Sequence, residues 1–145
     1  MTVYLDMNIM FDYLVGRQPY GLEVAQLMTL LRNEDVDVYM APNAIIMGFA
    51  ILRQQPHRMP PKDVKHSLAL FRRLASCVPV ENADVDAALS SPAPDDLEDG
   101  FQIVLAKKCG ATVIVSNDRT GFRDSPIEVM SSAEFLSKWE HSKQG

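Results

Sequence analysis

Four aspartates in this sequence stand where they could act together in catalysis. Asp6 ends a short apolar run near the start of the chain, Asp96 and Asp99 lie in the segment DDLEDG, and Asp118 follows the apolar run TVIVS. Carboxylates gathered in one place repel each other unless cations or protons intervene. Oxygen-rich sites of this kind suit Mg²⁺ or Mn²⁺. Such a metal polarises a phosphoryl oxygen and activates a bound water, so the chemistry it usually serves is displacement at phosphorus.

The strands and helices that must position these acids alternate along the sequence. The sequence predicts strands at residues 3–5, 36–40, 77–80, 112–116 and 127–130, and helices at residues 8–15, 22–31, 44–52, 62–74, 83–89, 97–108 and from 131 onward. Strands that alternate with helices predict an α/β fold, a three-layer α/β/α sandwich with a central, mainly parallel sheet. We expect a single domain over residues 1–145.

The predicted sheet explains why the acids could meet. In an open parallel sheet, ligands bind beyond the carboxyl ends of the strands. Asp6 and Asp118 follow two such strand ends, and Asp96 and Asp99 share one face of the helix before the second strand because they are three residues apart. We therefore expect these four acids at one edge of the sheet. Glu98, between them, is expected to face solvent.

Each acid also has an ordinary structural reading. Asp96, or Asp95 before it, could cap the following helix and favour its dipole. Asp118 could be the first residue of an Asx turn. Asp6 has the weakest alternative, because a carboxylate at the end of a buried strand is costly unless it is paired. The three features together favour a divalent-metal site.

The composition limits which class of protein this can be. The chain has 145 residues, 47% hydrophobic and 23% charged, which is ordinary for a globular domain. Its formal net charge of −5 argues against a protein that coats nucleic acid by bulk charge. Cys77 and Cys109 form neither a disulfide framework nor a metal-binding spacing. With no visible signal peptide and no apolar run long enough to span a bilayer, we expect a cytoplasmic protein with no membrane association.

Three stretches in order resemble the PIN domain family. VYLDMNIMFDYLVGRQPY resembles the family's opening, where a strand-end Asp is followed by an Asn two places on. DDLEDGFQIVLAKKCGATVIVSND resembles its central block, and GFRDSPIEVMSSAEFLSKW is similar to its last strand and helix. The resemblance runs nearly end to end, and it is greatest to the bacterial branch that includes VapC-like toxins.

The resemblance implies a metal-dependent endoribonuclease, a hydrolase of RNA phosphodiester bonds that uses Mg²⁺ or Mn²⁺. It implies that metal ligands and catalytic acids lie at Asp6, Asp99 and Asp118, with Asp96 as an accessory acid. Asn8 and Ser116 would position ligands or water by hydrogen bonds. Asp12 matches a recurrent acid of this branch that orients its neighbours.

The sequence departs from the family pattern at one helix. Many members carry a Glu in the helix after the second strand, and the matching place here is Met47. No acid occurs between Asp37 and Asp63. Asp12 or Asp96 could compensate for the missing ligand. The alternative is a catalytically weak or inactive PIN-like domain that acts as an RNA- or protein-binding module.

A nuclease must also hold the phosphate backbone of its RNA substrate. Arg119 adjoins Asp118, and Arg17 follows the first helix, so these two are the predicted RNA-binding residues. The VapC-like resemblance further implies a small antitoxin as partner and a homodimer. A third reading, a phosphatase-type hydrolase on another doubly wound sheet, would need a nucleophilic Asp in a strict local motif and a Lys placed for phosphate, which the sequence does not offer.

Overall fold

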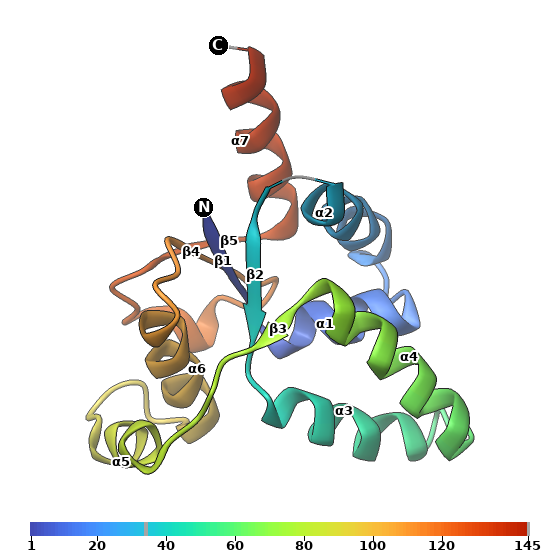
Figure 1. Cartoon of the computed structure of the whole chain (residues 1–145), viewed down its shortest axis with the longest axis horizontal. Coiled ribbons are helices and arrows are strands. Elements are labelled where there is room, and N and C mark those ends of the chain that lie inside the picture. The colour runs from blue at the N-terminus through green and yellow to red at the C-terminus, as the bar shows by residue number, and fades with distance from the viewer. Residues whose placement is uncertain (34, 145) are drawn as a thin grey trace.

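The computed structural model describes residues 1–33 and 35–144. Its strands are β1 (Thr2–Leu5), β2 (Asp37–Met40), β3 (Ser76–Cys77), β4 (Val113–Val115) and β5 (Glu128–Met130). Its helices are α1 (Met7–Val15), α2 (Gly21–Asn33), α3 (Asn43–Arg53), α4 (Pro61–Leu74), α5 (Asn82–Ser90), α6 (Leu97–Lys108), α7 (Ser132–Gln144) and a short 3-10 helix, η1 (Thr120–Phe122). The predicted alternation of strands and helices is confirmed (Figure 1).

The five strands form one parallel sheet in the order β3-β2-β1-β4-β5. β1 lies at its centre and pairs with β2 on one side and β4 on the other. Leu5 is in register with Val115, and the amide of Asp6 donates to the carbonyl of Val115 at 3.0 Å. The side chains that follow β1 and β4 therefore leave the sheet at the same edge.

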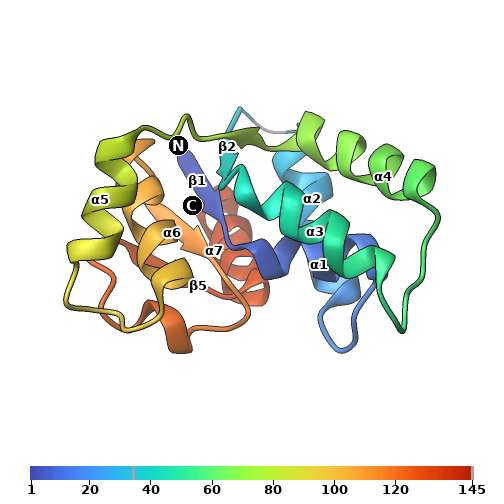
Figure 2. The same ribbon diagram turned by 90° about the horizontal axis from the view of Figure 1, so that it is seen from below.

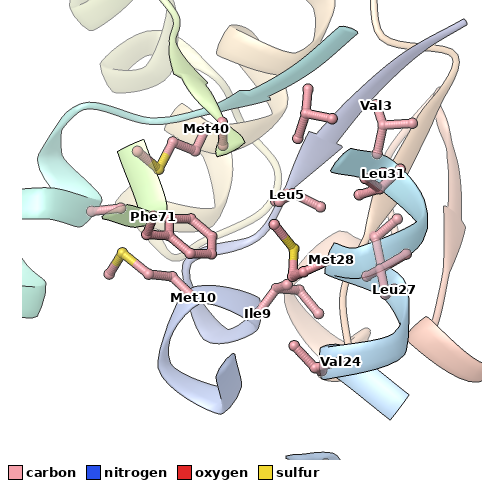
Figure 3. Close-up of a cluster of buried hydrophobic side chains, with 14 of the residues drawn as sticks. Val3, Leu5, Ile9, Met10, Val24, Leu27, Met28, Leu31, Met40 and Phe71 are labelled. Atoms are coloured by element: carbon pink, nitrogen blue, oxygen red, sulfur yellow. The ribbon is translucent and has the colours of Figure 1, made fainter. Parts of the chain in front are cut away.

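Helices cover both faces of the sheet, as predicted for a three-layer α/β/α fold. Side chains of a strand alternate between faces, and Val3 and Leu5 belong to one buried cluster while Tyr4 belongs to the other. The larger cluster packs the sheet against α1, α2, α3, α4 and α7, and Figure 3 shows its contributions from α1, α2 and α4. The smaller cluster packs the sheet against α6. Seen from below, α5 and α6 lie on one side of β1 and α1 to α4 on the other (Figure 2).

The ends of several elements differ from the prediction by one or two residues, and two differences are larger. The third strand, expected at residues 77–80, ends at Cys77. The amide of Val78 still donates to the carbonyl of Met40 at 3.0 Å, but Pro79 has no N–H and cannot continue the ladder. The other difference is the addition of η1 after β4.

Both cysteines are free and half-buried. No helix in the described part of the chain combines the length and apolar character needed to cross a bilayer.

Candidate active site

Asp6 lies at the centre of the candidate site, directly after β1, with 4% of its surface exposed. Its Oδ1 accepts a hydrogen bond from Gln102 Nε2 at 2.9 Å. Its Oδ2 lies 2.8 Å from Ser116 Oγ and 3.4 Å from Asn8 Nδ2. Burial raises the pKa of Asp6, and the hydrogen bonds from Gln102 and Ser116 oppose that rise. These neutral donors therefore favour the ionised carboxylate in a buried place.

Gln102 was not among the residues predicted from sequence. Its Oε1 accepts from the Tyr4 hydroxyl at 3.3 Å and from the Met7 amide at 3.4 Å. Burial raises the pKa of Tyr4, so its hydroxyl remains a donor. With Oε1 occupied by two donors, the amide nitrogen of Gln102 is the end that faces Asp6. Gln102 lies one turn after Asp99 on α6, and this spacing was the signal that could have found it.

Asp96 and Asp99 stand at the start of α6. Asp96 is the N-cap residue, and its Oδ1 accepts from the Asp99 amide at 3.1 Å, so the predicted capping role is present. The Asp99 carboxylate lies against the backbone of η1, because a Cβ built on Gly121 would fall 2.2 Å from Asp99 Oδ2. Glycine at position 121 is what leaves room for this carboxylate.

Asp118 follows β4 on an exposed turn. Its Oδ1 accepts from the Thr120 amide at 3.2 Å, which is the Asx turn considered as its structural reading. Its own amide donates to Ser116 Oγ at 3.1 Å. Ser116 Oγ also lies 2.8 Å from the Asp118 carbonyl, so Ser116 connects this turn to Asp6.

The acids of this edge act on one another electrostatically. The pKa of Asp99 is raised by burial and then by the charges of Asp96, Asp6 and Asp118. The expectation that Glu98 faces solvent is wrong: it is half-buried, because α6 turns it toward the site. The pKa of Glu98 is raised by burial and then by the charges of Asp6, Asp96 and Asp99. Five acids therefore influence one another electrostatically at this edge of the sheet.

These five acids form no ion pair with a lysine, arginine or histidine in residues 1–33 and 35–144. An all-oxygen, all-anionic donor set of this kind fits a hard divalent cation. As the side chains stand, no three His, Cys, Asp or Glu residues of the described ranges are gathered closely enough to hold a metal. The acids are electrostatic neighbours, and holding a cation requires some of their side chains to turn toward one another.

Asp12 lies outside this set. It is fully buried on α1, and Arg17 Nε is 2.6 Å from its Oδ1. Burial raises the pKa of Asp12, while Arg17 and the side chain of Asn117 oppose the rise. Asn117 Oδ1 in turn accepts from the backbone and hydroxyl of Ser132 at the start of α7. Asp12 is therefore paired with its own cation and is not a free substitute for the acid missing at Met47.

The two predicted RNA-binding arginines are both engaged with acids. Arg17 pairs with Asp12 and lies over the Tyr20 ring, with 48% of its side chain exposed. Arg119 pairs with Glu134 of α7, and both side chains are about half exposed, at 52% and 47%. Arg119 adjoins the Asp118 turn, whereas Arg17 lies at the end of α1.

Comparison with known proteins gives a consistent assignment. The PIN domain family matches residues 2–120. The chain is 28% identical over 141 residues to Ribonuclease VapC1 of Aquifex aeolicus (strain VF5), with 94% of each chain covered.

Solved structures with the same fold include two VapBC structures. VapBC2 from Rickettsia felis, bound to a DNA fragment from its promoter, has a TM-score of 0.64 at 11% identity and covers 90% of this chain and 98% of the other. VapBC-1 from nontypeable Haemophilus influenzae has a TM-score of 0.62 at 13% identity and covers 92% and 99%. The match over most of its length shows that the chain belongs to the PIN domain family, within which it is similar to VapC-type proteins.

Proposed function

We propose that this protein is a divalent-metal-dependent endoribonuclease of the VapC type, formed by one PIN-like domain over residues 1–145. The observation that carries the proposal is the set of acids after β1, in the first turn of α6 and after β4, which has no basic partner in the described residues. The similarity to Ribonuclease VapC1 supports RNA as the substrate.

In this proposal Asp6, Asp99 and Asp118 hold Mg²⁺ or Mn²⁺, with Asp96 as accessory acid. A cation held there would supply Lewis acidity toward the phosphoryl group and would activate a water as nucleophile. Gln102, Ser116 and Asn8 hold the Asp6 carboxylate in place through hydrogen bonds.

The phosphate backbone needs cationic contacts beside such a site. Arg119 supplies one next to Asp118, at the cost of its pairing with Glu134. Arg17, which pairs with Asp12 and has 48% of its side chain exposed, supplies a second in this proposal. The VapC-type resemblance also supports a small antitoxin partner, a homodimer and a cytoplasmic location as predictions for this chain.

The test is cleavage of an end-labelled single-stranded RNA with Mn²⁺, with Mg²⁺ and with EDTA. We expect cleavage only with a divalent metal. Asp6→Asn and Asp99→Asn should each lower the rate by about 10³-fold, because each removes metal-dependent stabilisation worth several kcal/mol. Asp95→Asn, which removes an exposed charge from the same segment, is the matched control. Cleavage that survives both site substitutions would overturn the proposal.

A second candidate is an inactive domain that binds RNA or protein. Two points favour it: Met47 stands where the family resemblance implies an acid, and no three acids of the described residues are close enough to hold a metal. This candidate predicts no cleavage with any divalent metal and no Mn²⁺ binding in calorimetry. Binding of Mn²⁺ that is lost in Asp6→Asn would exclude it.

A further inference from the structure

The positive charge of this chain is concentrated in one hairpin of helices. α3 and α4 pack against each other and, with the turn between them, form residues 43–74 (Figure 1). This α3–α4 hairpin holds six Lys and Arg and one acid, which gives a formal charge of +5. Since the whole chain carries −5, all other residues together carry −10. The hairpin is therefore a cationic part of an acidic protein, and such a part attracts polyanions.

The six cations of the hairpin are all exposed to solvent. They are Arg53, Arg58, Lys62, Lys65, Arg72 and Arg73. None of them forms an ion pair with an acid within residues 1–33 and 35–144. Arg53 Nη1 donates to the carbonyl of Met59 at 3.2 Å, which holds Arg53 on the turn between the two helices. The charge of these side chains therefore remains available to a ligand.

A groove of about 490 Å³ connects the hairpin to the acids of the candidate site. α1 follows β1 and α3 follows β2, and these strands are parallel neighbours, so both helices begin at the edge of the sheet that carries Asp6. The groove between the two helices is lined near this edge by Asn8, whose Nδ2 lies 3.4 Å from Asp6 Oδ2. It is lined farther away by Arg17, after the end of α1, and by His57, in the turn after α3.

The lining of this α1–α3 groove suits a single strand of nucleic acid. Phe11 of α1 and Ile51 of α3 supply apolar walls. Arg17 pairs with Asp12 through Nε and has 48% of its side chain exposed, so other N–H groups of its guanidinium can donate to a phosphate. Proteins hold single strands with apolar and aromatic surfaces for the bases and cations for the backbone.

A second groove, of about 330 Å³, lies between α3 and α4. It is lined by Ile46 and Phe49 of α3 and by Lys65 and Arg72 of α4, among others. The residues that line it belong to α3 and α4 alone, and none comes from α1, α6 or the strand ends that carry the acids. The α1–α3 groove, by contrast, includes Asn8 beside Asp6, so it favours the α1–α3 groove as the path of a strand cleaved at Asp6.

We propose that the α1–α3 groove holds the single-stranded RNA next to the scissile phosphate. The strand then continues over the turn of the hairpin, where Arg53 and Arg58 contact its backbone. This inference rests on the proposed function, because it takes RNA as the substrate. It explains how a chain with a net charge of −5 binds a polyanion.

The first experiment places a carboxylate in the groove. Ile51→Glu should weaken the binding of a fluorescein-labelled single-stranded RNA by about tenfold or more, because the new charge faces the phosphate backbone at short range. Fluorescence anisotropy measures the binding in the Asp6→Asn background, where the RNA stays intact.

Ile46→Glu is the matched control for Ile51→Glu. It makes the same change on the same helix, but in the groove between α3 and α4. The two isoleucines are 72% and 38% exposed, so both sites accept a charge in the folded protein. The control should change the RNA affinity by less than about threefold, because solvent and salt screen the added charge. Equal losses in the two variants would overturn the proposal.

The second experiment removes the two arginines of the turn. Arg53→Gln combined with Arg58→Gln should weaken RNA binding by about tenfold and make its salt dependence shallower by about two charges, because each lost phosphate contact releases fewer counterions. Arg32→Gln combined with Lys107→Gln removes the same charge from exposed positions outside the hairpin. This control should leave the salt dependence nearly unchanged, and a turn variant that behaves like it would overturn the proposal.

Crosslinking locates the strand without a substitution in the groove. RNA that carries 4-thiouridine is crosslinked to the Asp6→Asn protein by ultraviolet light, and mass spectrometry identifies the attached peptides. We expect crosslinks within residues 7–17 and 51–62. Crosslinks found only outside these two segments would contradict the proposed path.

RNA binding and RNA cleavage can fail independently. If the wild type cleaves RNA with Mn²⁺ while Ile51→Glu and the turn variant bind RNA as tightly as their parent, the inference fails and the proposed function survives. If RNA binds in this groove but no divalent metal supports cleavage, the proposed function fails and the inference survives. If the protein neither binds nor cleaves RNA, both fail.

Discussion

Asp6 and Asp12 are two buried carboxylates, six residues apart, with opposite surroundings. Asp6 is 4% exposed, and its hydrogen-bond donors, Gln102 and Ser116, are neutral. The charges near it are negative, since Asp6 acts on the pKa of Glu98 and of Asp99. Asp12 is 0% exposed, and the guanidinium of Arg17 lies 2.6 Å from it.

The difference shows how to distinguish a structural acid from a functional one. A buried carboxylate with its own arginine is partly compensated, and removing the arginine leaves a buried charge without a partner. A buried carboxylate whose hydrogen-bond donors are neutral and whose charged neighbours are acids has no counter-charge in the protein, and a cation from solution can supply one. Three predictions examine this contrast.

The largest effect should come from Arg17→Met. It leaves Asp12 buried without a counter-charge, so we expect a loss of about 3 kcal/mol in the free energy of unfolding. Urea unfolding followed by circular dichroism measures it. Mn²⁺ affinity of the folded protein should stay within about twofold, because Arg17 lies outside the acid set.

Arg73→Met, at an exposed position of α4, is the matched control and should cost less than about 0.5 kcal/mol. If Arg17→Met costs no more than this control, Asp12 does not depend on Arg17 and the comparison fails.

The sequence predicted the fold well, and it predicted that Asp6 and Asp118 follow neighbouring strands, because both follow from local patterns. Strand and helix periodicities gave the α/β/α layers, and the rule of strand ends brought Asp6 and Asp118 to one edge. What it could not give were partners set by tertiary packing. Gln102 carries no charge and therefore no signal of its own, and only its spacing from Asp99 pointed to the site.

The pairing of Asp12 also depended on a backbone detail. Gly16 ends α1 with φ of 61°, a left-handed conformation that glycine adopts without strain. The chain reverses there, and Arg17 returns to Asp12 on the preceding turn. The sequence predicted Arg17 as an RNA contact. It could not predict the pairing with Asp12, because a basic residue after a helix gives no information about which way its side chain points.

The second prediction concerns pH. Burial and neighbouring acids raise the pKa of Asp99 and Glu98, and burial raises that of Asp6. A raised pKa means that the folded state binds protons more tightly than the unfolded state. The stabilisation is therefore fully present below the ordinary pKa and is lost as pH rises through the folded value. In EDTA, we therefore expect the Tm to rise as the pH is lowered from neutral toward the ordinary pKa of these carboxyl groups.

Two comparisons sharpen the pH result. The pKa of Asp84 is lowered by Lys108, but that group loses its stabilisation only below its ordinary value of 3.8, outside this window. With saturating Mn²⁺ the trend should reverse, because metal ligands must lose their protons to bind. A Tm in EDTA that falls as the pH is lowered from 7 to 5 would contradict the repulsion among the acids.

The smallest effect should come from the exposed pair of Arg119 and Glu134. Because both side chains are about half exposed, we expect Arg119→Gln to change the free energy of unfolding by less than about 1 kcal/mol. Its effect should appear in RNA binding, measured by fluorescence anisotropy in the Asp6→Asn background so that the RNA stays intact. We expect weaker binding and a salt dependence shallower by about one charge.

Glu134→Gln provides the opposite test, since it releases Arg119 from its acid without removing the guanidinium. We expect RNA binding to strengthen by about twofold to fivefold, in keeping with the small free energy of an exposed ion pair. If Arg119→Gln instead destabilised the fold as much as Arg17→Met, an arginine paired with an exposed acid and one paired with a buried acid would be equivalent here. The distinction drawn between Asp12 and the acids around Asp6 would then lose its physical basis.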